Sequence, residues 1–315
     1  MQQQSRGFLK KVVTGRSLYV TALLVTVAGW FLAFELSPQD DMGGTLTALL
    51  LYLVAGCLLV GINRTFLLIR PQLLIQASVF FVLLAVYVPL HSLSTGVTAS
   101  LCFLLALYAL FMSYESSNAP AWVFHSFAAI GLCSVFVPRF SWLVPLFLFG
   151  ASLFRFMGLK SFLASVLGWL LPFWLLAAYA VLVGDTGLLL RPLKGILSFE
   201  SGGYDVLLSQ WPLWAYATLL FIVCSFYCMT ASLDDKIRER CYLQFFSAAG
   251  VFAIVLTLLQ PGLSGIMLPI LLLCTSMLCG RFMVSGNSRA SNVFFIVMAV
   301  LLVPLFIYNM VWMHL

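Results

Sequence analysis

Long apolar runs fill most of the chain, and each run is continuous rather than alternating between apolar and polar positions. A helix that crosses the hydrocarbon core of a bilayer needs roughly 20 apolar residues. Continuous runs predict helices, because the strands of a membrane barrel alternate. We therefore expect about eleven transmembrane helices, near residues 17–36, 45–62, 72–90, 95–113, 122–138, 141–154, 161–184, 212–232, 242–259, 263–279 and 291–313.

These spans predict an all-α, polytopic transmembrane helix bundle that occupies residues 1–315 as a single domain. The connections between the spans are too short to hold a soluble domain. The stretches at 122–138 and 141–154 are shorter than the others, so we expect them to be tilted or to pair as a hairpin.

Composition places the protein in lipid. The 315 residues are 63% hydrophobic and 8% charged, whereas about 25% of the residues of an average soluble domain are charged, and the mean hydropathy is +1.09. This balance excludes a soluble enzyme, a nucleic-acid-binding protein and a disordered chain. The bilayer is the expected environment, and composition by itself names no substrate.

The positions of Lys and Arg predict the orientation of the bundle, because cytoplasmic loops carry an excess of these residues. The basic tail at 1–16 is then cytoplasmic, the number of spans is odd and the C-terminus is external. All but three of the sixteen basic residues fall on the cytoplasmic side, and the exceptions are Arg139, Arg191 and Lys194. Beyond the tail, the cytoplasmic group is Arg64, Arg70, Arg155, Lys160, Lys236, Arg238, Arg240, Arg281 and Arg289.

The beginning of the chain is similar to a secretory signal, since basic residues precede the apolar run from Leu18 to Phe34. No small-x-small cleavage site follows this run, so we expect an uncleaved first span. Short loops and the lack of an organellar transit signature predict the cytoplasmic (inner) membrane of a bacterium as the location.

Metal and proton chemistry have few candidate residues within the spans. Six of the eight cysteines lie in apolar runs without a Cys-x-x-Cys pair, and His91, His125 and His314 fall in different regions. We therefore expect no firm metal or cofactor site. Ion-coupled transport usually requires charges within the spans, whereas here the polar residues Gln76 and Asn309 favour hydrogen bonds between helices.

The predicted outer face holds most of the acids, which are Glu35, Asp40, Asp41, Asp185, Glu200 and Asp205. The longest connection, 185–211, is also external, and its leucines interleave with Arg191 and Lys194. This pattern is typical of an amphipathic segment that lies in the membrane interface with its bases toward lipid phosphates. It is either an ordinary connector or one wall of a lipid-headgroup site.

Two further features of the outer face are candidates for chemistry. Arg139 lies in a tight turn at 137–141, where a planar guanidinium can bind phosphate with two hydrogen bonds or extend to lipid headgroups. Asp40 and Asp41 form a pair of carboxylates after the first span. They can hold a divalent cation or act as a base, or form a solvated acidic loop.

Several segments in the middle of the chain, with two earlier ones, carry a family resemblance. The chain resembles an uncharacterised family of polytopic integral membrane proteins from Bacteroidetes bacteria over perhaps two thirds of its length. The segments that carry this resemblance are Asn63 to Leu67, Arg70-Pro71, Phe124 to Phe136, Pro138-Arg139, Arg155 to Phe162 and Gly168 to Phe173.

A more distant resemblance is to the polytopic glycosyltransferases that use lipid-phosphate-sugar donors. The shared pattern is a first span that starts in the cytoplasm, acids in the first external loop and a central helix hairpin rich in small residues. The resemblance implies that Asp40 and Asp41 match the acidic motif, that Arg139 meets the donor phosphate and that a divalent cation is a cofactor.

Three functions from different classes follow from these features. The first is an enzyme of envelope glycan or lipid assembly that acts at the outer face on a polyprenyl-phosphate-type substrate. In this enzyme Asp40 or Asp41 is the base or metal ligand, and Arg139, Arg191 and Lys194 contact phosphate. The second is a non-catalytic scaffold or subunit of an envelope complex, with another envelope protein as its partner. The third is a lipid or small-solute permease.

Overall fold

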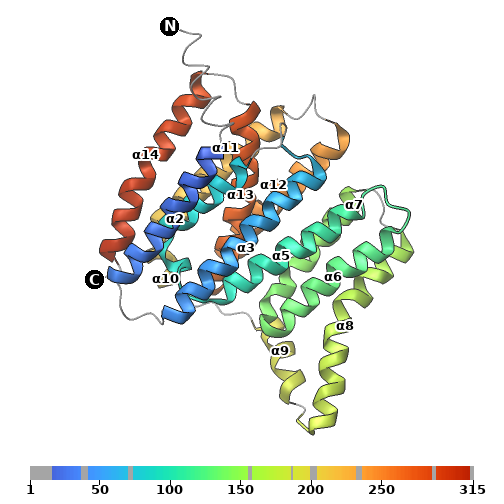
Figure 1. Ribbon diagram of the computed structural model, residues 1–315. Helices are drawn as coiled ribbons and strands as arrows, with labels where there is room; N and C mark the ends of the chain where they lie inside the picture. Colours follow the sequence, from blue (N-terminus) through green and yellow to red (C-terminus); the bar gives the residue numbers. More distant parts are fainter. Residues whose placement is uncertain are drawn as a thin grey trace.

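The predicted fold class, an all-α bundle, is confirmed. The computed structural model describes residues 16–36, 42–69, 74–154, 158–185, 187–198, 204–231, 236–285 and 289–312. Within these residues every regular element is an α-helix or a short 3-10 helix. Figure 1 shows the long helices packed side by side in one bundle.

Nine of the described helices are long and apolar enough to cross a membrane, which makes the chain a multi-pass membrane protein. They are α2 (Arg16–Leu36), α3 (Met42–Phe66), α5 (Thr95–Met112), α6 (Ala119–Phe136), α8 (Leu159–Val183), α11 (Trp211–Ala231), α12 (Ile237–Leu259), α13 (Ser264–Ser285) and α14 (Arg289–Trp312).

The other two predicted spans are shorter helices, each joined to a 3-10 turn. The stretch at 72–90 is α4 (Ile75–Val86) followed by η1 (Val88–Leu90), and the stretch at 141–154 is η2 (Pro138–Leu143) followed by α7 (Val144–Leu153). By contrast, α6 is longer than the predicted stretch at 122–138. It starts earlier because Pro120 lies in its first turn, where the missing N–H of a proline costs no hydrogen bond.

Helix α13 is the centre of the bundle. It is almost entirely buried and packs against α4, α5, α11 and α12. Close approach is possible because Gly96 of α5 leaves room for the Gly265 carbonyl and Pro269 of α13. A helix that is apolar on every side requires this complete enclosure by other helices or lipid.

Interhelical hydrogen bonds join the helices at a few polar positions. The Asn309 side chain of α14 donates to the Val86 carbonyl of α4 at 2.7 Å, as the sequence predicts. The corresponding expectation for Gln76 is wrong. Its side chain is buried, but neither amide atom has a hydrogen-bond partner among the described residues, because this part of α4 packs closely against Gly280 of α13.

Helices α6 and α8 share the most extensive helix–helix contact among the described residues. Gly131 of α6 faces the Trp169 carbonyl of α8, and Gly168 of α8 faces the Phe124 carbonyl of α6. Small residues at such positions let two backbones meet in a membrane. Beyond Pro172, the second half of α8 exposes most of its apolar side chains, and Figure 1 shows this half diverging from the bundle beside α9.

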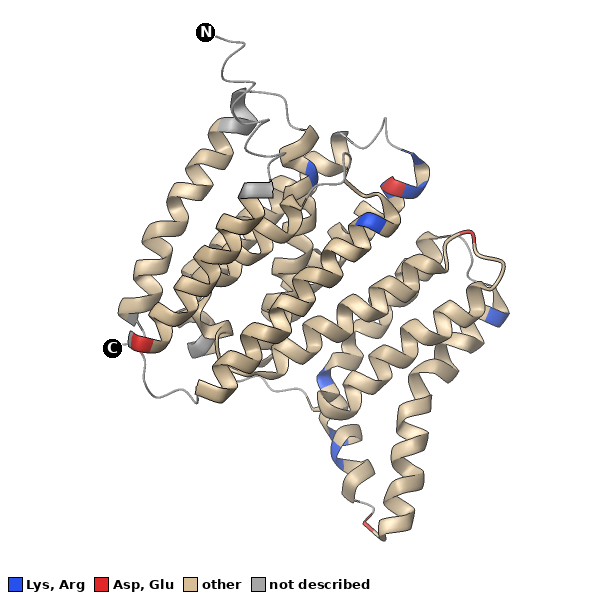
Figure 2. Cartoon of the chain, viewed as in Figure 1, with Lys and Arg blue, Asp and Glu red and all other residues tan. Residues whose placement is uncertain are grey.

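Charged residues lie at the two ends of the bundle, and the helix interiors between them lack charge in the described part of the chain. Figure 2 shows this separation. One end carries η2 and the helix α9 (Gly187–Leu197). We call it the outer end, after the orientation that the charges predict. The end that carries Arg64, Lys160 and Lys236 is the inner end.

The α6–α8 contact gives a direct test of the packing. A Cβ atom at Gly131 would overlap the Trp169 carbonyl, so Gly131→Ala must separate two backbones and should cost about 1–3 kcal/mol. We expect a clearly lower melting temperature for purified Gly131→Ala in detergent. Gly61→Ala is the matched control, because a Cβ atom there meets nothing within 4 Å. Equal melting temperatures for the two variants would contradict the packing described here.

Candidate functional site

The three basic residues predicted to face outward come from two segments that pack on each other. Arg139 lies in η2, whereas Arg191 and Lys194 lie in α9. Gly195 of α9 rests on the ring of Pro138, and a Cβ atom at Gly195 would lie 2.9 Å from two carbons of that ring. The contact joins the residue before Arg139 to the residue after Lys194. We call Arg139, Arg191 and Lys194 the basic cluster.

Hydrogen bonds fix η2 against its neighbours. The indole N–H of Trp142 donates to the Ile196 carbonyl of α9 at 3.2 Å, and the indole N–H of Trp169 in α8 donates to the Ser141 hydroxyl at 3.3 Å. Phe140 is buried beside them. The turn that carries Arg139 is therefore held from two sides, by α8 and by α9.

Helix geometry brings the two bases of α9 to one face. Residues three or four apart lie on the same side of a helix, so Arg191 shares one side of α9 with Lys194 and also neighbours Gly195. Both basic side chains are exposed, whereas Pro192 is buried. Arg139 is half-buried. In Figure 2 the blue residues of α9 lie close to the turn at the end of α6.

This arrangement suits an anion. Two guanidinium groups offer planar pairs of N–H donors that match the oxygens of a phosphate, and a lysine adds a third positive charge. The Asp185 carboxylate accepts a hydrogen bond from the Gly187 N–H at 2.8 Å. It caps the start of α9, where a negative charge is favourable.

The candidate catalytic acids, Asp40 and Asp41, lie outside the described residues, as does Glu200. The residues that flank the acidic pair are Glu35 in α2 and Met42 in α3. Helices α2 and α3 pack on α4 and α5, whereas η2 and α9 pack on α6 and α8. Figure 1 shows these two groups on different sides of the outer end. The structure thus brings the two segments that carry the three bases into contact, but it does not bring the helices that flank the acids to them.

His91 is buried near the end of α2. The sequence does not predict this position or the contacts that the side chain makes there. The His91 ring stacks on Trp30 with centroids 3.8 Å apart, and its Nε2–H donates to the Leu84 carbonyl at 3.0 Å. Its Nδ1 has no partner in the described part of the chain. Trp30 in turn donates to the Thr45 carbonyl at 3.2 Å. These residues are far apart along the chain, so only the fold reveals the contact.

Burial decides the protonation of His91. The side chain is 3% exposed, and desolvation lowers its pKa to about 4. The imidazole is therefore neutral at pH 7, with a lone pair on Nδ1.

Within the described residues, no three His, Cys, Asp or Glu side chains are grouped so that they could hold a metal ion. A divalent cation at this end would depend on Asp40 and Asp41 and stays a prediction. Comparison of the chain with protein-family models, with curated proteins and with solved structures finds no match. The two family resemblances therefore also stay predictions.

The low pKa of His91 predicts a loss of stability in acid. In the unfolded chain the His91 imidazole binds a proton near pH 6.5, whereas in the folded protein it binds one only near pH 4. The free energy of unfolding therefore keeps its full value above about pH 6.5 and falls by about 3 kcal/mol as the pH drops to 4. Unfolding by a denaturing detergent, followed by tryptophan fluorescence between pH 7.5 and 4.5, should show this decline.

The decline should be smaller in His91→Gln, whose amide can still donate to the Leu84 carbonyl. His125→Gln is the control, because His125 is exposed on α6. The explanation fails if His91→Gln loses as much stability in acid as the unmodified protein.

Proposed function

We propose that the protein binds a polyprenyl-phosphate-type lipid at the outer face of a bacterial inner membrane and acts in the assembly of envelope glycans or lipids. The observation that carries this proposal is the packing of η2 on α9, which gathers Arg139, Arg191 and Lys194 into one basic cluster. A polyprenyl phosphate offers the matching anion at the membrane surface.

A specific phosphate site explains the cluster better than independent snorkelling does. Arginine and lysine that only anchor a helix end need no tertiary contact. Here, two segments distant in sequence are joined by the Gly195–Pro138 contact and by the Trp142 hydrogen bond. The predicted outer side also carries few bases, and all three of them belong to these two segments.

The exposed apolar side chains of α9 support a position of this helix in the membrane interface. Leu190, Leu193 and Leu197 are exposed, so this face of α9 suits the boundary between headgroups and hydrocarbon. The basic face of the same helix then lies at the level of lipid phosphates.

The catalytic part of the proposal is a prediction from the sequence, because the helices that flank Asp40 and Asp41 lie on a different side of the outer end from the basic cluster. One carboxylate would take the proton from an acceptor hydroxyl, or both would hold a divalent cation that would polarise that hydroxyl. The sugar or lipid fragment passes from the donor phosphate to the acceptor oxygen, and polyprenyl phosphate leaves with its charge held by the basic cluster.

Removing the positive charges tests the phosphate site. For Arg139→Gln/Arg191→Gln/Lys194→Gln in nanodiscs, we expect the affinity for undecaprenyl phosphate to fall about tenfold or more, because the loss of even one charge-assisted hydrogen bond costs about 1.5–3 kcal/mol. Affinity for the uncharged alcohol undecaprenol should not change. The control is Arg64→Gln/Lys160→Gln/Lys236→Gln, which removes three exposed bases at the inner end.

The two outcomes that contradict the proposal are distinct. Equal affinity of both triple variants for undecaprenyl phosphate would argue against the phosphate site. Asp40→Asn/Asp41→Asn should keep the binding and lose the envelope product. Unchanged envelope glycans in cells that carry only this double variant would argue against the catalytic role.

A further inference from the structure

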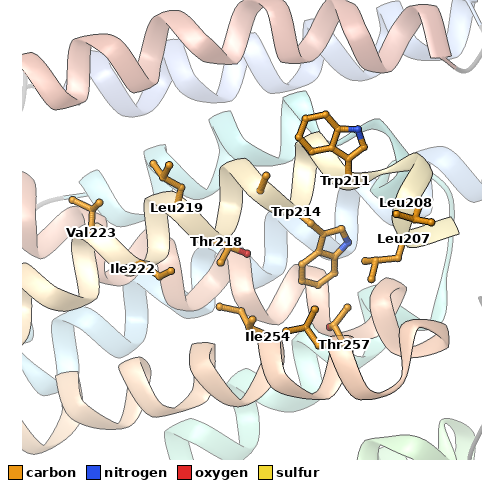
Figure 3. A pocket seen from close by; sticks show the side chains of 12 residues that line it. Leu207, Leu208, Trp211, Trp214, Thr218, Leu219, Ile222, Val223, Ile254 and Thr257 are labelled. Atoms are coloured by element: carbon orange, nitrogen blue, oxygen red, sulfur yellow. The ribbon is translucent and has the colours of Figure 1, made fainter. Parts of the chain in front are cut away.

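Two apolar grooves follow α11 and α12 on the surface that faces lipid. The outer groove has a volume of about 680 Å³ and runs from Trp211 and Trp214 to Ile222 of α11, opposite Ile254 and Leu258 of α12 (Figure 3). The second groove, about 620 Å³, lies between α7, α11 and α12. We call it the α7 groove, and its wall includes Pro145, Phe149, Met229, Gln244, Val251 and Val255.

The α7 groove is open because α7 uses a different face to pack on the bundle. Phe147 and Gly150 of α7 point inward, and Gly150 lies against the Phe245 ring of α12. The edge with Pro145 and Phe149 remains toward lipid. Since α7 has only ten residues, it covers part of α12 and leaves the rest of the groove without a helical cover.

The α7 groove is long enough for a lipid chain. From Gln244 to Val255, α12 rises about 17 Å, and most of the side chains that line the groove are apolar. A hydrocarbon chain that lies along α12 contacts apolar side chains over this length.

We infer that the α7 groove holds the hydrocarbon chain of the lipid whose phosphate binds the basic cluster. This inference rests on the proposed function. Charge complementarity supports it, because α7 begins directly after η2 and Arg139 lies six residues before Pro145. At the rise of a 3-10 helix this separation is about 12 Å, which one lipid spans. The residues that line the outer groove come from α11, α12 and the segment 207–208, and none of them belongs to η2, α7 or α9.

Filling the groove tests the inference. Val251 is 52% exposed toward the groove, so Val251→Trp adds a ring there without entering the core. We expect its affinity for undecaprenyl phosphate to fall about tenfold, to the level of the short-chain geranyl phosphate. Affinity for geranyl phosphate itself should not change, because its phosphate still reaches the basic cluster. Val255→Trp is a second variant with the same expectation.

The outer groove supplies the matched control. Ile222 is 56% exposed and lies in that groove, so Ile222→Trp adds a similar ring on the same surface. It should leave the affinity for both phosphates unchanged. All variants are compared as monodisperse protein in nanodiscs with a melting temperature equal to that of the unmodified chain.

Two results would overturn the inference. One is wild-type affinity for undecaprenyl phosphate in both Val251→Trp and Val255→Trp. The other is a loss confined to Ile222→Trp, which would place the chain in the outer groove. Failure of the proposed function has a different signature. In that case the triple variant of the basic cluster keeps its affinity for undecaprenyl phosphate and for geranyl phosphate alike.

Discussion

The structure depends on close backbone packing in a solvent that gives apolar side chains no reason to associate. Lipid is as apolar as leucine, so helices in a bilayer are joined by tight van der Waals contact and a few hydrogen bonds. Glycines provide the contact at the α5–α13 and α6–α8 interfaces, where Gly96, Gly131 and Gly168 face backbone carbonyls. The same device appears at the outer end, where Gly195 of α9 rests on Pro138.

The contact between Gly195 and Pro138 also builds the candidate site. Because α8 is bound to α6 along their shared glycine interface, the chain that leaves α8 returns next to the turn at the end of α6. Helix α9 then lies on η2, and the Trp142 hydrogen bond fixes the pair. The two segments that carry Arg139, Arg191 and Lys194 are in contact as a consequence.

The sequence predicts the helices that can be recognised from the length of a continuous apolar run. Nine of the eleven expected spans are long helices among the described residues. Shorter elements such as α4 and α7 were harder to predict, because prolines and 3-10 turns shorten a helix without making the run less apolar. The amphipathic pattern around Arg191 and Lys194 also predicts a real helix, α9.

Contacts between distant segments could not be predicted from one sequence. Nothing in the residues around Arg139 indicates that Gly195 will rest on Pro138, or that His91 will stack on Trp30. Hydrophobic periodicity assigns a residue to a helix face but does not name the helix opposite. The buried Gln76 shows the same limit, since its polarity predicts a hydrogen bond that the packing against Gly280 does not supply.

The central claim is that the outer end holds a lipid phosphate through Arg139, Arg191 and Lys194. Cryo-electron microscopy of the protein in nanodiscs with undecaprenyl phosphate tests this most directly. The account predicts phosphate density between η2 and α9, within hydrogen-bond distance of the two arginines, continuing as chain density beside α7. Density for the lipid at another place on the protein, with the surface between η2 and α9 occupied only by bulk solvent, would contradict it.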